Sequence, residues 1–506
     1  MPAIPFCLEL LGSPVDTTTF SLTKPSYRHY LSAQNHAHFE AVAPQLEGWQ
    51  RRNRYYYRDM ERLHQFLIPP GAQVLEIGCG LGDLLASVSP SVGVGIDFSD
   101  AVVGLARQRH PQLQFYCLDA ETLTPAALDP DHQTFDYIVL AGVLGYLSDV
   151  QTVLQRLAPL CHPRTRVILS FHNYLWEPLL QLAERVGQRR PQPPQSWLST
   201  QDVANQLEIT GFTVLKRGTR LLVPKRMPII SDAINRYVAP LPLIKHLCLT
   251  SYVIARPTPS LLSTLAQPTC SVIIPARNEA GNIRNAVARL PQLGRHTEVI
   301  FVEGHSRDRT WEDIQALVQD YQGPFTLKAF QQQGKGKADA VRLGFSQATG
   351  DVLMILDADL TVPPEDLPHF MAVMASGRGE FINGSRLVYP RSRRAMPWLN
   401  TLANKIFAQI FSFLLEQPLK DTLCGTKVLW RDDYQRIAAG RAYFGDFDPF
   451  GDFDLLFGAA KLNLHIVEVP IRYQPRDYGA SNIAHFKEGL VLLRMCLYAC
   501  RKLKFR

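Results

Sequence analysis

Short apolar segments rich in β-branched residues alternate with helical segments twice along the chain. The strands predicted in the first series are residues 73–77, 93–96, 114–117, 137–140 and 166–171. Those predicted in the second series are residues 271–274, 298–302, 326–330 and 351–356. Because strands that alternate with helices form parallel sheets covered on both faces, the pattern predicts two α/β domains in tandem.

A proline-rich segment separates the two series. Residues 257–269 contain Pro257, Pro259 and Pro268 and are predicted to form a linker. The predicted organisation is a helical lead-in over residues 1–50, a first domain over 51–256 and a second over 270–506. A chain of 506 residues is too long for one ordinary domain, which supports this division.

Composition excludes several classes of protein. An apolar fraction of 46% is enough for packed cores, and a net charge of +7 is too dilute to indicate nucleic-acid binding. The nine cysteines are scattered without a C-x-x-C pair, which argues against disulfide pairing or a zinc module and favours the cytoplasm. Residues 1–11 lack the basic start of a signal peptide, and no apolar stretch is long enough to predict a transmembrane helix.

A predicted strand of the first domain ends in a glycine-rich turn. Residues 74–82 read Val-Leu-Glu-Ile-Gly-Cys-Gly-Leu-Gly, which places Glu76 just before Gly78, Gly80 and Gly82. Glycines let the backbone turn sharply and let a ligand approach the main chain, and the helix that follows offers free N–H groups. A tight turn without a ligand remains the alternative for this motif alone.

Acidic residues end the next two predicted strands. Asp97 can accept hydrogen bonds from two ribose hydroxyls, and Asp119 with Ala120 is placed to meet an adenine amino group. In a dinucleotide site the third glycine would fall at Asp83, whose charge would repel a pyrophosphate. The pattern therefore favours an adenosine without phosphates, and a helix cap is the alternative for Asp97.

With these motifs, residues 50–256 resemble the class I S-adenosylmethionine-dependent methyltransferases. Glu76 and the three glycines match the first motif of that family, Asp97 its ribose-binding acid and Asp119 its adenine-side acid. The resemblance implies a Rossmann-like sheet and S-adenosyl-L-methionine as cofactor. Tyr146 and His172 are the candidate catalytic residues on the acceptor side, and packed or rim positions are the alternative for both.

A pair of aspartates follows an apolar strand of the second domain. Asp357 and Asp359 are two residues apart, so they point to the same side of an extended chain. Two close carboxylates repel each other unless a proton or a cation lies between them. Mg²⁺ or Mn²⁺ would satisfy both and still coordinate diphosphate oxygens, whereas solvated loop acids are the alternative.

Other strand ends of this domain also carry polar groups. Residues 271–283 read as a strand, a turn and a helix start, and Glu303 ends the following strand. Residues 334–345 begin as a flexible basic loop suited to phosphate, although the order of glycine and lysine is not that of a P-loop.

Together these features resemble the family 2 inverting glycosyltransferases over residues 270–480, most nearly the dolichyl- or polyprenyl-phosphate sugar synthases. The resemblance implies a GT-A-type sheet, a divalent metal on Asp357 and Asp359, and a UDP- or GDP-sugar donor. The donor-binding residues that it implies are Pro275, Arg277, Asn278, Glu279, Glu303, Lys335, Gly336, Asp357, Ser385 and Arg386. Arg476 lies in the loop that closes over the phosphates, and Asp452 and Asp454 are candidate bases with structural roles as the alternative.

Two amphipathic helices are predicted in the second domain. Residues 398–416 carry an apolar stripe that includes Phe407 and Phe411, and arginines precede it. The stripe is too short to span a bilayer, so it predicts a helix in the membrane plane, with a helix buried in the fold as the alternative. Residues 486–506 end in a basic tail that could contact anionic lipid or remain solvated.

The combined prediction is a bifunctional enzyme, peripheral on the cytoplasmic face of a membrane, that transfers methyl and glycosyl groups in one glycan or glycolipid pathway. The predicted acceptor of the sugar is a lipid phosphate. One alternative is a soluble saccharide or protein acceptor. Another is that the first domain is a non-catalytic cofactor-binding or scaffold module.

Overall fold

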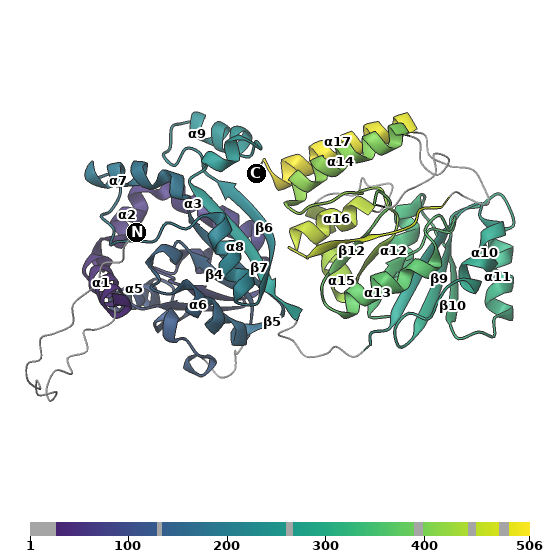
Figure 1. Ribbon diagram of the computed structural model, residues 1–506, viewed down its shortest axis with the longest axis horizontal. Coiled ribbons are helices and arrows are strands. Elements are labelled where there is room, and N and C mark those ends of the chain that lie inside the picture. Colours follow the sequence, from purple (N-terminus) through teal and green to yellow (C-terminus); the bar gives the residue numbers. More distant parts are fainter. Residues whose placement is uncertain are drawn as a thin grey trace, which may run out of the picture.

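The computed structural model describes residues 27–128, 134–259, 267–388, 398–443, 452–474 and 485–505. Two sheets of seven strands lie side by side, one in each half of the chain (Figure 1). The predicted lead-in contains described helices from residue 27 onward, and most of the predicted linker, residues 260–266, lies outside the described part.

The first sheet has the strand order β3-β2-β1-β4-β5-β7-β6. Its strands are β1 (Gln73–Ile77), β2 (Val92–Asp97), β3 (Gln114–Cys117), β4 (Phe135–Ala141), β5 (Cys161–His172), β6 (Phe212–Arg220) and β7 (Thr250–Pro257). The helices of this half are α1 (Tyr27–Val42), α2 (Leu46–Arg52), α3 (Arg54–Leu67), α4 (Asp83–Ser87), α5 (Asp100–Arg109), α6 (Val150–Leu157), α7 (Glu177–Arg185), α8 (Thr200–Ile209) and α9 (Ile230–Ala233). Helices cover both faces, since α3 and α5 pack in one buried cluster and α6 and α8 in the other.

The second sheet has the strand order β10-β9-β8-β11-β13-β12-β14. Its strands are β8 (Cys270–Ala276), β9 (Thr297–Glu303), β10 (Thr326–Gln331), β11 (Val352–Ile355), β12 (Phe381–Ser385), β13 (Lys427–Trp430) and β14 (Ile466–Pro470). The helices are α10 (Ile283–Ala288), α11 (Thr310–Asp320), α12 (Lys337–Gln347), α13 (Leu367–Ala375), α14 (Trp398–Leu415), α15 (Arg431–Ala439), α16 (Asp452–Lys461) and α17 (His485–Leu503).

Both sheets are mixed, which corrects the prediction of purely parallel sheets. In the first sheet β7 is antiparallel to β5 and to β6. In the second, β13 is antiparallel to β11 and to β12. The central strands β1, β2 and β4, and likewise β8, β9 and β11, remain parallel, so their carboxyl ends meet at one edge of each sheet.

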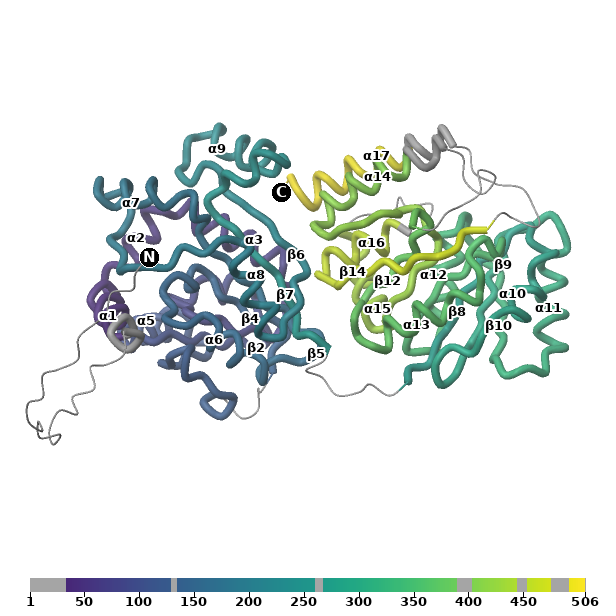
Figure 2. Tube along the Cα trace, in the orientation of Figure 1, coloured from purple at the N-terminus to yellow at the C-terminus, as the bar shows by residue number. Residues whose placement is uncertain are grey.

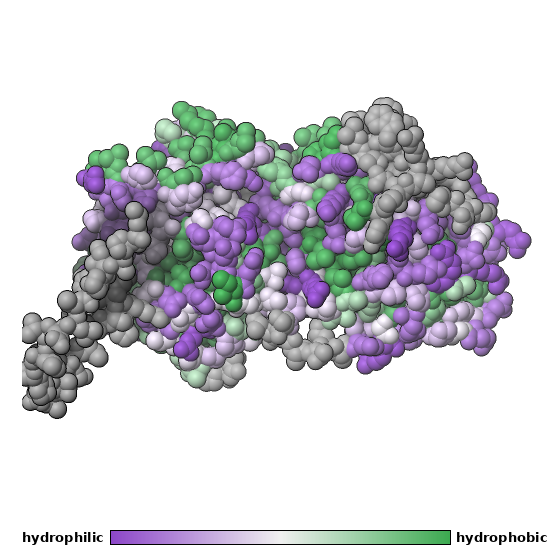
Figure 3. All heavy atoms as spheres, viewed as in Figure 1, coloured by the Kyte–Doolittle hydropathy of each residue, from purple (hydrophilic) through white to green (hydrophobic). Residues whose placement is uncertain are grey.

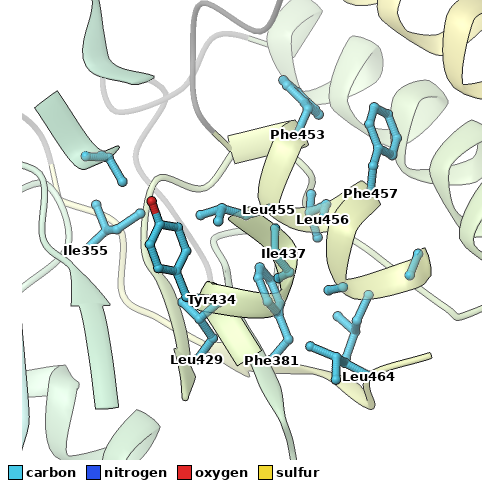
Figure 4. Close-up of a cluster of buried hydrophobic side chains, with 14 of the residues drawn as sticks. Ile355, Phe381, Leu429, Tyr434, Ile437, Phe453, Leu455, Leu456, Phe457 and Leu464 are labelled. Carbon is cyan, nitrogen blue, oxygen red and sulfur yellow. The ribbon is translucent and has the colours of Figure 1, made fainter. Parts of the chain in front are cut away.

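Helix α14 is only partly exposed. Phe411, Leu414 and Leu415 are buried in the core, and the Phe411 ring stacks on Phe457 of α16 at 5.4 Å between centroids. Figure 4 shows side chains of β11, β12, β13, α15 and α16 meeting in this core. One face of α14 therefore packs in the core, as expected for the alternative of a helix buried in the fold. Ile406 on the other face is 53% exposed.

The two halves share a buried ionic contact. Arg166 of β5 is 2% exposed and donates to both carboxylate oxygens of Glu380, at 2.8 and 2.7 Å. Arg256 of β7 lies 3.5 Å from the same carboxylate, and the backbone N–H of His465 donates to it. Burial pushes the pKa of Glu380 upward, but the two arginines outweigh it and lower the pKa to about 2. Glu380 is therefore a carboxylate that holds β5 and β7 of the first sheet to the second half.

The carboxyl end of the chain also returns to the first half. Arg236 donates to the backbone carbonyl of Phe505 at 2.9 Å, and the rings of Tyr237 and Phe505 lie 5.6 Å apart. Figure 2 shows this end of the chain beside the segment that contains α9. Among the described helices, none is both long and apolar enough to cross a bilayer.

Candidate functional site

The glycine turn lies directly after β1. Gly78, Gly80 and Gly82 all have positive φ, at +70°, +53° and +76°. The N–H of Gly80 donates to Asp97 Oδ2 at 3.1 Å, which ties the turn to the end of β2. A Cβ at Gly78 would lie 2.8 Å from a methyl carbon of Val143, whereas a Cβ at Gly80 would meet nothing within 4 Å. The turn is therefore packed against Val143 at Gly78 and has free space for a ligand at Gly80.

The predicted acidic residues gather beside this turn. Asp97, Asp119 and Ala120 line one pocket with Gly78 and Tyr146. Asp97 does not cap the next helix, because Ser99 does so by accepting from the N–H of Val102. Burial raises the pKa of the Asp97 carboxyl, and the N–H groups of Ser99 and Gly80 oppose that shift. The site therefore holds two hydrogen-bond acceptors where a ribose and an adenine are expected.

Glu76 lies under the glycine turn. It is 3% exposed, and its Oε2 has no hydrogen-bond partner among the residues that the structure describes. Burial raises its pKa well above the ordinary value. A buried carboxyl oxygen without a partner beside a glycine turn fits a site that receives a polar ligand.

Helix α1 covers this pocket. Asn35 is buried and donates to the carbonyl of Tyr146 at 2.8 Å. Phe39 packs edge-on against both Phe98 and Tyr146, with centroids 5.6 and 5.3 Å apart. Part of the predicted helical lead-in is therefore a wall of the site.

A larger cleft of about 1140 Å³ opens from the same turn toward α3 and α7. Tyr146 and His172 both line it. Burial, with a further effect of Arg189, lowers the pKa of His172 to about 3, so its imidazole is neutral at pH 7 and weakly basic. Burial raises the pKa of Tyr146, whose hydroxyl donates to Gln192 at 2.7 Å. Both residues thus lie at the cleft, but neither has a pKa suited to accepting a proton near neutrality.

In the second half, Asp357 lies two residues after β11. Its Oδ1 lies 2.6 Å from Nζ of Lys337, the first residue of α12. Burial would raise the pKa of Asp357, but Lys337, Lys427 and Arg386 together hold it below the ordinary value. A Cβ at Gly425 would lie 2.0 Å from Asp357 Oδ2, so glycine at this position leaves room for the carboxylate. Lys337 contacts Asp357, and the charges of Lys427 and Arg386 act on the same carboxylate, so positive charge gathers near the end of β11.

Asp359 is held by the turn that follows β11. Its Oδ1 accepts from the N–H and the hydroxyl of Thr361, at 3.1 and 2.9 Å. Within the described part of the chain, no three acidic, histidine or cysteine side chains converge on one point. Asp357 and Asp359 are thus each held by their own partner, Lys337 and Thr361.

The tips of β8 and β9 are joined by their loops. Asn278, with φ of +57°, accepts through Oδ1 from the N–H of Arg307 at 2.7 Å. Glu303 is buried and accepts from the N–H of Ser306 at 2.5 Å and from Gln331 at 3.2 Å. Burial would raise the pKa of Glu303, but these donors lower it, so it is a carboxylate at the end of β9.

The other donor-binding candidates divide into buried and exposed positions. Pro275 lies in β8, and buried Glu279 accepts from Asn282 at 2.8 Å. Arg277, Lys335 and Gly336 are exposed. Lys337, two residues after Lys335, is the lysine that contacts Asp357.

Arg386 is fixed by Asp421. Its Nε and Nη2 donate to the two oxygens of Asp421, each at 2.8 Å, and Asn404 donates to the same carboxylate. Burial opposes the shift, but Arg386 lowers the pKa of Asp421 to about 2. The neighbouring hydroxyls of Ser385 and Thr426 are buried without a partner among described residues, as expected beside a ligand site.

The candidate bases differ in what can be described. Asp454 lies on α16 and accepts from Arg342 at 3.1 Å and from Arg441 at 2.8 Å. The side chain of Asp452 and all of Arg476 lie outside the described residues. Both arginines donate to the same oxygen, Oδ2, and this ionic contact is what the structural alternative for Asp454 expects.

Both halves match families of known proteins. Residues 49–217 match the model of a methyltransferase domain, and residues 271–437 match the model of glycosyl transferase family 2. The chain joins a methyltransferase domain to a family 2 glycosyltransferase domain. The glycine turn and its acids belong to the first domain, and Asp357 with its three cations belongs to the second.

The curated relatives cover the glycosyltransferase domain. A dolichol-phosphate mannosyltransferase of Pyrococcus furiosus is 29% identical over 42% of this chain and 58% of its own length. A low-salt glycan biosynthesis hexosyltransferase of Haloferax volcanii is 27% identical over 46% of this chain and 53% of its own. An undecaprenyl-phosphate 4-deoxy-4-formamido-L-arabinose transferase of Pseudomonas aeruginosa is 35% identical over 21% and 32%. The chain thus spans little more than half the length of the first two.

Solved structures are more distant. Magnesium protoporphyrin IX methyltransferase of Synechocystis is 16% identical, with 44% of this chain and 96% of that chain covered and a TM-score of 0.30. Glucosyl-3-phosphoglycerate synthase of Mycobacterium tuberculosis is 18% identical, with 47% and 80% covered and a TM-score of 0.34.

Sequence reasoning missed three residues of the glycosyltransferase site. Lys337 begins α12 and pairs with Asp357, Lys427 is fully buried near it, and Asp421 orients Arg386. Lys337 belongs to the same basic loop as Lys335, so the loop itself was the available signal. Residues 421–427, which hold Asp421 and Lys427, also resemble a later signature of the glycosyltransferase family, so that motif was a further signal.

Replacing Gly78 by alanine is expected to weaken cofactor binding at least about tenfold and to destabilise the methyltransferase domain by roughly 1–3 kcal/mol. The added Cβ would lie 2.8 Å from Val143 at a φ of +70°, so the turn must shift. Isothermal titration with S-adenosyl-L-methionine checks the affinity. The matched control is Gly104→Ala on α5, where a Cβ would meet nothing within 4 Å. Equal affinities in both variants would contradict this assignment.

Proposed function

We propose that the glycosyltransferase domain moves a sugar from a UDP- or GDP-sugar to a dolichyl or polyprenyl phosphate. The observation that carries this proposal is the group of Lys337, Lys427 and Arg386 around Asp357 at the end of β11. A nucleoside diphosphate brings two or more negative charges, which these cations would bind. The names of relatives that act on dolichol phosphate and undecaprenyl phosphate support the choice of acceptor.

Asp357 and Asp359 would hold Mg²⁺ or Mn²⁺. The metal would neutralise charge on the departing diphosphate. Lys337 pairs with Asp357 in the structure. A metal ion bound to that carboxylate would displace Lys337, whose ammonium group could then bind a phosphate oxygen. Arg386, held in place by Asp421, would contribute a second fixed positive charge.

The transfer would be an in-line displacement. An oxygen of the acceptor phosphate would attack the anomeric carbon, and the bond from that carbon to the diphosphate oxygen would break with its electron pair leaving on the diphosphate. A phosphate acceptor is already an anion and needs no base. A mechanism without a base agrees with the contacts of Asp454, because its carboxylate already accepts hydrogen bonds from Arg342 and Arg441.

The methyltransferase domain would hold S-adenosyl-L-methionine at the turn after β1. Asp97 would bind the ribose, Asp119 and Ala120 would lie at the adenine, and Glu76 with Gly78, Gly80 and Gly82 would hold the rest of the molecule. The bound cofactor would supply an electrophilic methyl group. Helix α1 would exclude water, and the cleft lined by Tyr146 and His172 would position the methyl acceptor.

Replacing Asp97 by asparagine is expected to weaken S-adenosyl-L-methionine binding about tenfold to a hundredfold, because a charged acceptor for two hydroxyls is lost. Isothermal titration measures the dissociation constant. Asp100→Asn is the matched control, since Asp100 lies three residues further on, exposed in the first turn of α5. Binding that weakens equally in both variants would mean that Asp97 does not contact the cofactor.

The decisive experiment incubates the full chain with labelled UDP- and GDP-sugars, polyprenyl phosphate and Mg²⁺ or Mn²⁺. Labelled lipid is the expected product, and no transfer in any combination would refute the proposed activity. Transfer to a soluble saccharide alone would favour the alternative acceptor. Cofactor binding without methyl transfer to any lipid-linked or free glycan would favour a non-catalytic first domain. The proposed location is the cytoplasmic face of a membrane, where both acceptor and nucleotide sugars meet.

A further inference from the structure

The connection between β6 and β7 is a long excursion, residues 221–249, that contains α9. Several of its apolar side chains are exposed to solvent. Ile229 is 84% exposed, Leu243 is 87% exposed and Leu247 is 53% exposed. Isolated exposed apolar residues are ordinary, but several on one short segment indicate a contact surface.

Two polar side chains of the excursion, Ser231 and Asn235, bond to its own backbone. Ser231 is fully buried, accepts from the N–H of Met227 and donates to the carbonyl of Lys225. Asn235 bonds both the N–H and the carbonyl of Val223, each at 2.8 Å. These hydrogen bonds fix the backbone on either side of Ile229, which stays exposed between them.

The tip of the excursion carries a strained residue. Ile229 has φ of +67°, a conformation that β-branched residues rarely adopt. Strain of this kind persists where the surrounding structure enforces it and commonly marks a functional surface. Here it presents one of the most exposed apolar side chains among the described residues.

Helix α7 extends the same surface. Leu182 and Val186 are 55% and 61% exposed, and both also line the methyltransferase cleft. The indole N–H of Trp176 donates to the carbonyl of Leu247 at 2.8 Å, which joins α7 to the excursion. Figure 3 shows apolar side chains gathered along this edge, over α7, α9 and the ends of α14 and α17 (Figure 1).

The charges of the excursion indicate what kind of partner binds its exposed apolar surface. Residues 221–249 contain four cationic residues, Lys225, Arg226, Arg236 and Lys245, and one acidic residue, Asp232. Tyr55 of α3 donates to Asp232 at 2.9 Å, which turns the acid toward the protein. Exposed apolar side chains flanked by cations suit an anionic bilayer, where the chains enter the acyl region and the cations meet the headgroups.

We propose that the excursion 221–249 and α7 dock the methyltransferase domain on an anionic lipid bilayer, so that its cleft opens at the membrane surface. This inference rests on the proposed function, because it supplies both domains with acceptors from one membrane. The excursion meets the carboxyl end of α17 through Arg236 and Phe505, so the exposed Leu497 of α17 can share the same bilayer.

Flotation of the full chain with vesicles tests the proposal. The vesicles contain phosphatidylglycerol and phosphatidylcholine, or phosphatidylcholine alone, without polyprenyl phosphate. The wild-type chain is expected to float with the anionic vesicles and at least about tenfold less with the neutral ones. The double variant Ile229→Asp/Leu243→Asp is expected to lower the partition coefficient at least about tenfold.

The matched control is Ile209→Asp. Ile209 is 67% exposed at the end of α8, beyond the opposite end of β6 from the excursion. It is expected to float like the wild type. No flotation of the wild type, unchanged flotation of the double variant, or equal flotation with neutral vesicles would overturn the proposal. A dimer in solution that the double variant abolishes would also overturn it, in favour of a second copy on this surface.

Sugar transfer to polyprenyl phosphate in detergent separates this proposal from the proposed function. Transfer in detergent without vesicle binding would refute docking alone. Vesicle binding without transfer under any condition would refute the proposed activity alone. Equal thermal unfolding of all variants shows that the substituted surface residues leave the fold intact.

Discussion

Replacing Asp357 by asparagine is expected to lower glycosyl transfer roughly a hundredfold to a thousandfold, which corresponds to about 3–4 kcal/mol of transition-state stabilisation. Asp357 lies two residues after β11 beside Lys337, and its carboxylate is the proposed ligand of the divalent metal. An amide keeps the shape but loses the charge that holds the metal. Initial rates with labelled nucleotide sugar, measured across metal concentrations, check the result.

The matched control for Asp357 is Asp351→Asn. Asp351 lies at the opposite end of the same strand, is exposed and accepts from the N–H and hydroxyl of Thr269. Its substitution is expected to leave transfer within about twofold, since surface substitutions have small effects. Should Asp357→Asn retain the wild-type rate and metal dependence, the metal assignment would be wrong.

Replacing Glu380 by glutamine is expected to destabilise the protein by about 3–5 kcal/mol, the usual cost of removing one partner from a buried ion pair. Arg166 and Arg256 would remain buried without a counter-charge between the domains. Urea unfolding, followed by a probe in each domain, measures the loss. We expect the two domains to unfold at different urea concentrations in the variant, because the buried contact that joins them is weakened.

The same residue predicts a pH dependence. The pKa of Glu380 is lowered from 4.5 to about 2, because its arginines outweigh the effect of burial. A lowered carboxyl pKa contributes stability that is present above the unfolded value and is lost as pH falls through the folded value. The wild type should therefore lose about 3 kcal/mol more than Glu380→Gln between roughly pH 4.5 and pH 2.

An exposed pair across the same interface supplies the control. Arg164 contacts Asp432 at 2.9 Å, with the two side chains 44% and 58% exposed. Asp432→Asn is expected to cost less than about 1 kcal/mol. A similar loss in both variants would mean that the buried cluster has no special role in joining the domains.

Local patterns located the strands well where a strand is short, buried and bounded by turns. The predicted segments 73–77 and 114–117 coincide with β1 and β3. Asp97 ends β2, and Asp119 and Asp357 each lie two residues after β3 and β11, at the carboxyl ends of the strands as expected. The strands β12, β13 and β14 were not predicted. β12 pairs with β13 and with β14, although long helical segments separate these strands in the sequence. The periodicity of apolar residues within one strand or helix carries no information about such long-range pairing.

The amphipathic stripe of α14 illustrates the same limit. Its spacing predicts a helix, and α14 covers residues 398–415. The spacing does not say what covers the apolar face, and the structure places Phe411 against Phe457 in the core. The exposed apolar surface lies instead on α7 and the excursion 221–249, which the sequence pattern did not single out.

The sequence by itself determined the two α/β domains, the glycine turn and the acids that end their strands, because backbone freedom and strand periodicity are local properties of neighbouring residues. Only the tertiary structure decided that Lys337 rather than Lys335 meets Asp357, that Asp421 fixes Arg386, and that Glu380 joins the domains. Each of these contacts depends on side chains brought together by long-range packing, where burial strengthens the attraction between charges.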